Sequence, residues 1–259
     1  MRNSEIRSVV IMGSGNMAWH MGHWLIGSGI QVNQIFSRNI ERGAGLAAEL
    51  KTEFTNRLDK IQERTNLYLL TISDDALTAV IRQAVFGNRL VIHMAGSVPI
   101  DIFKEKVKNF GVLYPLQTFT MGKPVEYSQI PVFIEASNAK NLARIEQLAF
   151  KLSDRVYKVD SEKRAYIHLA AVIASNFTNH MLAVAEKYMQ ERNLSFDLIK
   201  PLVQETIAKA LSISPFLAQT GPAVRGNTGV IEKHLSLLEN HPEIRELYRV
   251  ISESIVNLH

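Results

Sequence analysis

A glycine turn near the N-terminus decides the fold of this chain: Val9-Val10-Ile11-Met12-Gly13-Ser14-Gly15-Asn16-Met17-Ala18. The four apolar residues before Gly13 predict a strand that is buried on both faces. Apolar residues then recur at helical spacing as far as Gly27 and Gly29, which predict the end of a helix. A strand, a glycine turn and a helix in this order are typical of a dinucleotide-binding turn, with Ala18 as the third small residue.

The turn has the residue types that a pyrophosphate requires. Gly13 allows a tight turn, Gly15 lets the backbone approach the phosphates, and Ala18 lets the helix pack closely against the strand. The helix N-terminus offers free N–H groups and a partial positive charge to the anion. An ordinary glycine-rich turn is the alternative interpretation. We favour a nucleotide site, whose cofactor-binding residues are Gly13, Ser14, Gly15, Asn16 and Met17.

The residues after the second predicted strand, 31–36, indicate which cofactor binds. In NAD-binding proteins an acid about 20 residues beyond the glycines binds the ribose hydroxyls. This chain has Ser37 and Arg38 there, and no acid follows before Glu41. A guanidinium pairs with a 2′-phosphate, to which Ser37 can also donate a hydrogen bond, whereas an acid repels it. The pattern therefore favours NADPH over NADH. The alternative is that Arg38 is a solvated turn residue.

Length and composition indicate a soluble protein of two domains. The chain has 259 residues, of which 46% are hydrophobic and 21% charged, and 29 basic residues stand against 25 acidic ones. The basic residues are scattered, so we expect no nucleic-acid partner. Without cysteine, the chain has no disulfide, thiolate nucleophile or cysteine metal site. The polar N-terminus and the lack of an apolar run near 18 residues predict a cytoplasmic protein without a signal peptide or a membrane span.

Strands alternate with helices as far as residue 160, which predicts a Rossmann-type α/β fold with a doubly wound, mostly parallel sheet. Further strands are expected at residues 52–55, 67–72, 89–93, 111–113, 130–135 and 155–159, and helices at 40–50, 99–107 and 138–152. Ligands bind outside the carboxyl ends of parallel strands, and a turn of small residues lets a nicotinamide ring approach the backbone. The candidates at strand ends are Ile72, Ser73, Asp74, Ala95, Gly96 and Ser97 for the cofactor, and Gln117 and Thr118 for the substrate.

Several polar residues of this half have simpler interpretations. Asp74 and Asp75 lie in the first turn of a predicted helix, where acids favour the N-terminus, and adjacent residues point in different directions. We therefore interpret them as capping residues rather than as a pair of cooperating carboxylates. His93 ends a predicted strand and is interpreted as structural. His20 and His23 lie three apart on the first helix without a third metal ligand, so we expect no metal site there.

From Ser161 onward the pattern predicts helices alone. The first helix runs some 30 residues, to about Gln190, and its centre at 169–174 is apolar all round, so we expect it to be buried on most sides. Polar residues within such a helix need partners or a purpose, and they include His168, Ser175 and Asn176. Two more helices are expected near 196–212 and 228–238 and a last one from Pro242, with a Gly-Pro loop at 219–228.

Several segments resemble known families. Ile11-Met12-Gly13-Ser14-Gly15-Asn16-Met17-Ala18 resembles the opening of pyrroline-5-carboxylate reductases, and the layout resembles the superfamily of 6-phosphogluconate and β-hydroxyacid dehydrogenases. Three segments resemble a little-characterised family of NADP oxidoreductases: Tyr114-Pro115-Leu116-Gln117-Thr118-Phe119, Ala174-Ser175-Asn176-Phe177 and Thr220-Gly221-Pro222-Ala223-Val224-Arg225-Gly226-Asn227. The resemblance covers nearly the full chain. It implies an NADP-binding domain over residues 1–160 and an all-helical substrate and dimerisation domain over 161–259, but no particular substrate.

The chain departs from these families at two positions. The β-hydroxyacid dehydrogenases use a Lys and an Asn four residues apart on the first long helix. If Asn176 matches that Asn, the position of the Lys holds Val172. Tyr114 stands where the closer family has His. The missing Lys argues against simple β-hydroxyacid oxidation.

Hydride transfer to a C=O or C=N bond requires a positioned cofactor, a donor that polarises the acceptor atom, and a proton source. His168 is a candidate proton donor because histidine ordinarily titrates near neutral pH, and Arg225 can bind a carboxylate bidentately. We assign catalysis to His168, Asn176 and Arg225, and substrate binding to Gln117, Thr118, Ser175, Gly221 and Pro222. The alternative roles are helix packing for His168 and Asn176 and loop anchoring for Arg225.

Three functions are consistent with these residues. The first is an NADPH-dependent reductase of a small, acidic carbonyl or imine compound, with NAD as the less favoured cofactor. The second is a nucleotide-binding sensor without catalysis, which the missing Lys favours. The third uses a deazaflavin coenzyme, against which Arg38 argues, because only NADP has a 2′-phosphate for it to bind. The apolar helix at 161–190 suggests the core of a homodimer, although burial within a monomer would give the same pattern.

Overall fold

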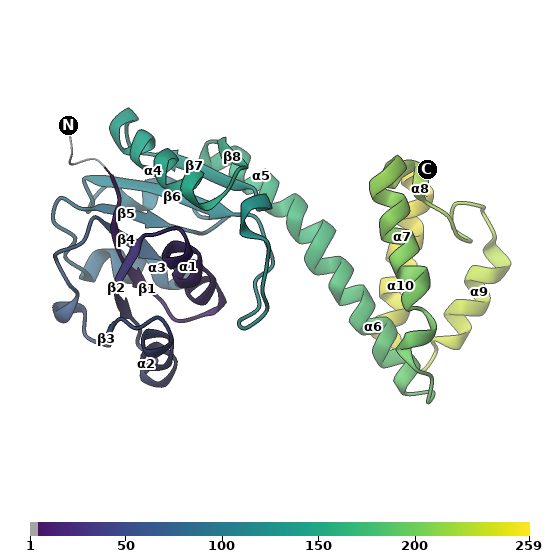
Figure 1. The fold of residues 1–259 in the computed structure, drawn as a ribbon. Helices are drawn as coiled ribbons and strands as arrows, with labels where there is room; N and C mark the ends of the chain where they lie inside the picture. The colour runs from purple at the N-terminus through teal and green to yellow at the C-terminus, as the bar shows by residue number, and fades with distance from the viewer. Residues whose placement is uncertain (1–4) are drawn as a thin grey trace. The chain divides into compact units, whose positions relative to one another are not determined.

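The computed structural model describes residues 5–259, and the chain divides between Ala174 and Ser175 into two compact units (Figure 1). The first unit holds every strand found among residues 5–259. Its strands are β1 (Ser8–Met12), β2 (Gln31–Phe36), β3 (Glu53–Thr55), β4 (Leu67–Leu70), β5 (Leu90–His93), β6 (Asn109–Pro115), β7 (Val132–Ala136) and β8 (Val156–Lys158). Its α-helices are α1 (Asn16–Gly27), α2 (Ile40–Glu49), α3 (Asp74–Gln83), α4 (Ala139–Leu152) and α5 (Ser161–Ala171).

The eight strands form one sheet in the order β3-β2-β1-β4-β5-β6-β7-β8. Neighbouring strands pair in parallel, except β6 and β7, which are antiparallel. This arrangement confirms the expected Rossmann-type, mostly parallel sheet. The eight predicted strands are present, with ends shifted by a few residues.

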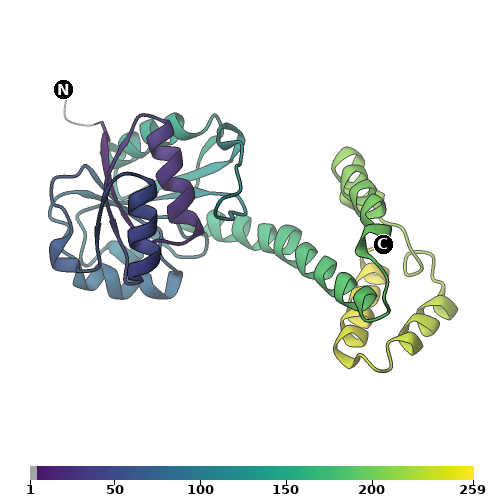
Figure 2. The same ribbon diagram turned by 60° about the horizontal axis from the view of Figure 1, so that its bottom comes forward.

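Alternate residues of β1 enter different cores, as strand geometry requires. Val9 and Ile11 pack with apolar residues of α1, α2 and α4, whereas Val10 and Met12 pack with apolar residues of α3. Helices therefore cover both faces of the sheet, which explains why the central strands are almost continuously apolar. Figure 2 shows α1 and α2 side by side in front of the sheet.

One local prediction for this unit is wrong, and one predicted strand is longer than expected. The helix expected at residues 99–107 is a 3-10 turn, Ile100–Phe103, because a short segment that buries Ile100 and Phe103 needs no full helix. The strand expected at 111–113 continues through Tyr114 to Pro115, where β7 pairs with it. Tyr114 is therefore a strand residue with an 8% exposed side chain.

The predicted long helix is present, although it is not uniform. It consists of α5, a π-helical segment Val172–Phe177, and α6 (Thr178–Gln190). By length and composition Ser161–Gln190 could span a membrane, with a hydropathy of 1.2, although the core helix of a soluble protein meets the same criteria. The expected burial of residues 169–174 is not provided by their own unit, because Leu169 and Ile173 are 57% and 54% exposed.

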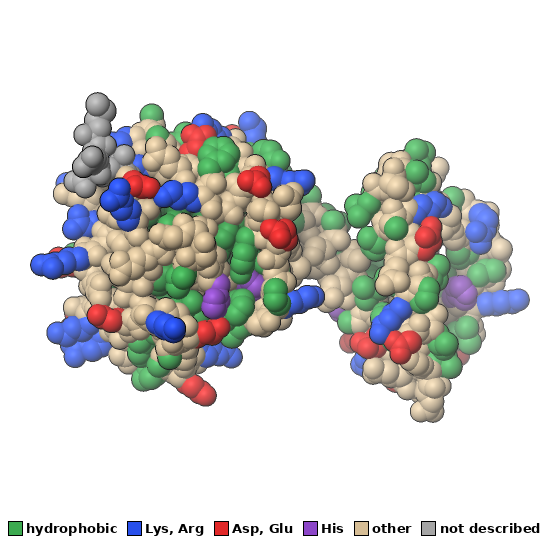
Figure 3. Space-filling model, viewed as in Figure 1, with side chains coloured by type: hydrophobic (Ala, Val, Ile, Leu, Met, Phe, Trp, Pro, Cys, Tyr) green, Lys and Arg blue, Asp and Glu red, His purple; other side chains and the backbone are tan. Residues whose placement is uncertain are grey.

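The second unit, residues 175–259, is entirely helical. After α6 it contains the 3-10 turn Phe196–Leu198, α7 (Lys200–Ile213), α8 (Pro215–Ala218), α9 (Thr228–Leu237) and α10 (Pro242–Leu258). Its buried apolar side chains are those of Ala223 and Leu238, and many large apolar side chains are visible on its surface (Figure 3). The domain boundary that the sequence suggests at residue 160 stays a prediction.

Candidate functional site

The glycine turn lies between the carboxyl end of β1 and the start of α1. Gly13 has φ +142°, and its N–H donates a hydrogen bond to Phe36 O at 2.8 Å. A Cβ on Gly13 would lie 2.6 Å from the backbone oxygen of Thr71, so a side chain cannot fit between β1 and β4. A Cβ on Gly15 would meet nothing within 4 Å. A glycine is therefore needed at the two positions for different reasons. Gly13 allows the strands to meet, and Gly15 leaves the outside of the turn open.

A cavity of about 640 Å³ opens beside this turn, at the carboxyl ends of β1, β2 and β4. It brings together seven of the predicted cofactor-binding residues: Gly13, Ser14, Gly15, Ser37, Arg38, Ile72 and Ser73. The lining also includes residues that the sequence analysis did not select, namely Phe36, Asn39, Arg42, Thr71, Ala76 and Val80. The cavity therefore joins segments from Gly13 to Val80, which are 67 residues apart in the sequence.

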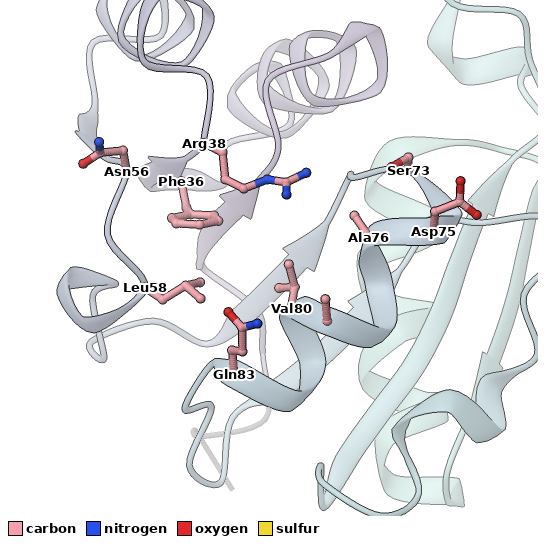
Figure 4. A pocket seen from close by; sticks show the side chains of 10 residues that line it. Phe36, Arg38, Asn56, Leu58, Ser73, Asp75, Ala76, Val80 and Gln83 are labelled. Carbon is pink, nitrogen blue, oxygen red and sulfur yellow. The ribbon is translucent and has the colours of Figure 1, made fainter.

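A second cavity of about 530 Å³ continues from the first and shares five lining residues with it: Phe36, Arg38, Ser73, Ala76 and Val80. Its remaining lining residues are Asn56, Leu58, Asp75, Ala79 and Gln83. Figure 4 shows the Arg38 side chain lying above the Phe36 ring and pointing toward α3. A slot with apolar side chains and a cation at its edge suits a flat aromatic group that carries a negative charge at one side.

Arg42 is the most informative residue that the sequence analysis missed. It lies in the first turn of α2, four residues after Arg38, and both arginines line the larger cavity. The helix is capped by Asn39, whose side-chain oxygen accepts a hydrogen bond from Arg42 N at 2.9 Å. The available signal was the position of Arg42, a basic residue in the first turn of the helix that follows Arg38.

Ser37 lies between the glycine turn and α2. Its Oγ is 2.7 Å from Ser14 Oγ and accepts a hydrogen bond from Asn39 N at 3.2 Å. Two of the predicted cofactor residues are therefore in direct contact. Their hydroxyls, the N-terminus of α2 and two guanidinium groups converge on the same cavity, which is a suitable environment for a phosphate.

The other predicted cofactor residues do not line these cavities. Asn16 donates a hydrogen bond to Phe119 O at 3.0 Å and accepts one from Met121 N at 3.3 Å, so it holds the loop after β6 against α1. Met17 packs against the core on the α1 side of the sheet. Asp74 accepts a hydrogen bond from Ser97 Oγ at 2.6 Å, so its carboxylate links α3 to the turn after β5.

Gly96, in that turn, contacts a polar pair. A Cβ on Gly96 would lie 2.6 Å from His168 Nδ1 and 2.9 Å from Tyr114 Cζ, so both rings pack directly against the glycine. Tyr114 Oη and His168 Nδ1 are 2.9 Å apart and share a hydrogen bond. Ala95 is partly buried beside Gly96. The structure thus brings the candidate acid His168 to a turn that the sequence assigned to the cofactor.

A buried arginine holds the helix that carries His168. Arg164, four residues earlier on α5, is 1% exposed and forms an ion pair with Glu135 of β7 at 2.5 Å. It also donates to Val98 O at 2.6 Å, and Ser161 Oγ donates to Glu135 at 2.8 Å. These bonds connect α5 to the sheet and to the segment after β5. They therefore fix the position of His168.

His93, interpreted above as structural, is fully buried at the end of β5. Its Nδ1 accepts a hydrogen bond from Ala95 N at 3.2 Å. Burial, with a smaller effect of the Arg164 charge, lowers the pKa of His93 to about 3. The imidazole is therefore neutral at physiological pH and helps to shape the turn before Gly96.

The helical histidines of α1 have hydrogen-bond partners. His20 is buried, and its two ring nitrogens lie 2.9 Å from Tyr127 Oη and from Thr120 O. His23 Nε2 lies 2.9 Å from Glu49 Oε1. Among residues 5–259 no group of three or more His, Cys, Asp or Glu side chains is placed to hold a metal ion.

The candidate substrate residues lie in two separate units. Gln117 and Thr118, in the first unit, are exposed, and Gln117 Oε1 accepts a hydrogen bond from Thr118 N. Ser175 and Asn176, in the second unit, belong to the π-helical segment and are exposed. Such segments are frequent at functional sites. Gly221 and Pro222 are partly buried and Arg225 is exposed, in a turn where Gly221 and Gly226 have positive φ values.

Comparisons with known proteins agree with this fold. Residues 130–255 match a family described as a domain of unknown function, DUF2520. No curated protein matches the chain. A solved structure from Bacteroides fragilis, described as a "putative NADP oxidoreductase", is 36% identical with a TM-score of 0.90, and the match covers 98% of this chain and 99% of that one.

More distant structures share the fold alone. A 1-pyrroline-5-carboxylate reductase from Streptococcus pyogenes is 14% identical, with a TM-score of 0.64 over 96% of this chain and 98% of that one. An imine reductase from Myxococcus stipitatus, solved with NADP+, is 13% identical, with a TM-score of 0.61 over 96% and 92%.

The sheet and its glycine turn define a Rossmann-type oxidoreductase. The chain belongs to the little-characterised family of such oxidoreductases that includes the Bacteroides fragilis protein and carries the DUF2520 domain.

Proposed function

We propose that this protein is an NADPH-dependent reductase of a small, acidic compound with a C=O or C=N bond. The observation that carries the proposal is the cavity beside the glycine turn, which Arg38 and Arg42 both line. No carboxylate is among the described residues that line it. Two guanidiniums favour the 2′-phosphate of NADPH over the free ribose hydroxyls of NADH.

The cofactor residues have distinct roles in this proposal. The N–H groups at the start of α1, exposed beyond Gly15, bind the pyrophosphate. Ser37, Arg38 and Arg42 bind the 2′-phosphate, and the slot between Phe36 and Val80 takes the adenine. The turn of Ala95, Gly96 and Ser97 borders the nicotinamide, which supplies a hydride when bound.

The chemistry of the remaining residues completes the reaction. His168 is the source of the proton that the substrate oxygen or nitrogen needs once its carbon has accepted a hydride. Arg225 binds the substrate carboxylate and Asn176 polarises the acceptor atom. The substrate-binding residues are Gln117, Thr118, Ser175, Gly221 and Pro222.

We also propose that the protein is a cytoplasmic homodimer that binds neither nucleic acid nor membranes, with a substrate and dimerisation domain over 161–259. The support is the surface of the second unit. Leu211, Leu217 and Leu198 are 82%, 70% and 68% exposed there. Apolar surface on this scale needs cover, and a second copy of the same helices can provide it symmetrically.

A fluorescence titration with NADPH and with NADH tests the cofactor proposal. We expect NADPH to bind more tightly, and Arg38→Ala and Arg42→Ala each to weaken NADPH binding by about 10- to 150-fold, since a charge-assisted contact contributes roughly 1.5–3 kcal/mol. NADH binding should hardly change. Arg155→Ala is the control, because Arg155 is exposed at the start of β8 and outside both cavities.

Two outcomes would overturn the cofactor proposal. Equal affinity for NADPH and NADH in the native protein would show that the arginines do not select the phosphate. Failure of both to bind would favour the deazaflavin coenzyme, which lacks a 2′-phosphate.

Measuring turnover distinguishes an enzyme from a sensor. The sensor is the alternative favoured by Val172, which stands at the position expected for the catalytic Lys. NADPH oxidation is followed with a panel of keto acids and cyclic imines. We expect one class to be reduced, with a rate that falls in His168→Ala and Asn176→Ala. Tight NADPH binding without turnover across the panel would favour the sensor.

A further inference from the structure

The strand residue Tyr114 has a hydroxyl that the proposed function leaves without a role. The residue stands at the carboxyl end of β6, and its ring packs against Phe133 with a centroid distance of 6.3 Å. Its hydroxyl lies 2.9 Å from His168 Nδ1. A buried tyrosine hydroxyl usually has a hydrogen-bond partner, and the partner of Tyr114 is an imidazole on a different element, which can itself carry a proton.

The surroundings of the pair place it at the predicted site. Gly96 lies against both rings, at the atoms that share the hydrogen bond: Nδ1 of the imidazole and Cζ, which carries the hydroxyl. In sequence, Tyr114 is followed within four residues by Gln117 and Thr118. Tyr114 thus contacts the turn proposed for the nicotinamide and closely precedes, in sequence, the segment proposed for the substrate.

The hydroxyl remains protonated in this environment. Burial raises the pKa of Tyr114, the positive charge of Arg164 opposes this, and the negative charge of Asp74 adds to it. A neutral tyrosine can both donate and accept a hydrogen bond. It can accept from Nδ1–H of an imidazolium, and it can donate to Nδ1 of a neutral imidazole whose proton is on Nε2.

We propose that Tyr114 is a catalytic residue, which gives its hydroxyl proton to the substrate and recovers a proton from His168. This inference rests on the proposed reductase function. As the substrate carbon accepts a hydride, the electron pair of the C=O or C=N bond moves to the oxygen or nitrogen. That atom takes the proton from Tyr114 Oη, the Nδ1–H bond of the imidazolium breaks, and its proton passes to Oη. The products are the reduced substrate, a neutral tyrosine and a neutral His168 with its proton on Nε2.

The buried contacts of α5 hold the Tyr114 hydroxyl and the His168 imidazole at a fixed separation. Arg164 lies one helical turn before His168 and is held by Glu135 and Val98 O. Proton transfer between Oη and Nδ1 requires a short and stable separation, which a rigid helix provides better than a loop. Arg164 is therefore a positioning residue for the pair.

The first test needs neither substrate nor cofactor. The tautomer of the neutral His168 imidazole is measured by nitrogen-15 NMR of histidine-labelled native protein in alkaline buffer, with His168→Gln to assign its signal. We expect the proton on Nε2, because Nδ1 accepts from Tyr114. A proton on Nδ1 would overturn the inference, since Nδ1 would then already donate to Oη and the product state described above would not exist.

The second test is kinetic and uses Tyr114→Phe, which keeps the ring that packs against Phe133. We expect kcat to fall at least about 100-fold, the usual contribution of a general acid, with NADPH affinity unchanged within a factor of two. Tyr166→Phe is the matched control. Tyr166 lies on α5, as His168 does, but its side chain is exposed and its hydroxyl donates to Glu162, so kcat should not change.

The outcomes separate this inference from the proposed function. If kcat of Tyr114→Phe stays within threefold of the native value while His168→Gln loses activity, His168 delivers the proton directly and the inference is wrong. If NADPH does not bind and no substrate is reduced, the proposed function fails and the relay fails with it. A proton on Nε2 in that case still leaves the Tyr114–His168 hydrogen bond as described.

Discussion

At the scale of single residues, the two glycines of the turn are under different constraints. Gly13 is constrained by its backbone conformation and by its neighbours, since φ is +142° and a Cβ would meet both the side chain and the backbone of Thr71. Gly15 has open space around it. The fold therefore requires Gly13, whereas we propose that the ligand requires Gly15.

Gly13→Ala and Gly15→Ala should separate these roles. We expect Gly13→Ala to lose about 2–3 kcal/mol of unfolding free energy, from a strained φ and from overpacking against β4. Gly15→Ala should unfold like the native protein but bind NADPH more weakly, because its methyl group occupies the space proposed for the pyrophosphate. Urea unfolding and cofactor titration of both variants check this. Equal stability of the two would contradict the assignment.

His93 provides a pH test at the same scale. Because its pKa is lowered to about 3 in the folded protein, the unfolded chain binds a proton on this residue below about pH 6.5, while the folded protein does not. Acid therefore favours unfolding, by about 1.4 kcal/mol per pH unit between those two values. Above about pH 6.5 both states are neutral and the effect vanishes.

His93→Asn should remove this pH dependence, since an asparagine oxygen can accept from Ala95 N but does not titrate. We expect the native protein to lose about 2–3 kcal/mol more than the variant between pH 7 and pH 4.5, measured by urea unfolding at both values. Parallel pH profiles would show that His93 is protonated in the folded protein.

At the scale of elements, α5 is connected to the sheet by a few buried polar contacts. Arg164, Glu135 and Ser161 form one network in which the guanidinium is 1% exposed and the carboxylate side chain 17% exposed. A network of this kind defines a helix position more sharply than apolar packing does, because each bond has a required length and direction.

Arg164→Met should therefore be strongly destabilising. It leaves Glu135 and Val98 O without their buried donor, and we expect a loss of about 3 kcal/mol in unfolding free energy together with reduced activity. Lys163→Met is the control. Lys163 is exposed and its contact with Asp160 is 3.7 Å long, so its loss should change stability by less than about 1 kcal/mol.

At the scale of the whole molecule, the second unit buries few of its own apolar side chains. Between residues 175 and 259 the buried apolar side chains are Ala223 and Leu238. Helices stabilised by so little burial are marginal in water. In the proposed homodimer, the partner subunit supplies the burial that the second unit lacks.

Light scattering on a size-exclusion column tests the dimer. We expect twice the chain mass of 29.1 kDa at micromolar concentration, and a shift toward the monomer in Leu211→Glu, which places a charge on the most exposed leucine of α7. Glu205→Lys, which reverses the charge of an exposed residue on the same helix, serves as the control. A monomeric native protein would remove the proposal.

The sequence by itself determined the order of strands and helices, the glycine turn and the entirely helical second half. These features depend on local patterns: apolar runs for buried strands, helical spacing, and caps such as Asn39 and Asn138, whose side chains accept from the third residue beyond. The helix wrongly predicted at residues 99–107 lies where a short apolar segment is compatible with several conformations.

Only the tertiary structure decided which side chains meet. Tyr114 and His168 are 54 residues apart, and Arg164 and Glu135 are 29 apart, so no periodicity relates them. The exposure of Leu169 also could not be predicted from the sequence. An apolar helix has the same sequence pattern whether its own unit or another unit packs against it. Local patterns record the conformation of the backbone, whereas a site depends on which strand ends and helices the sheet order brings together.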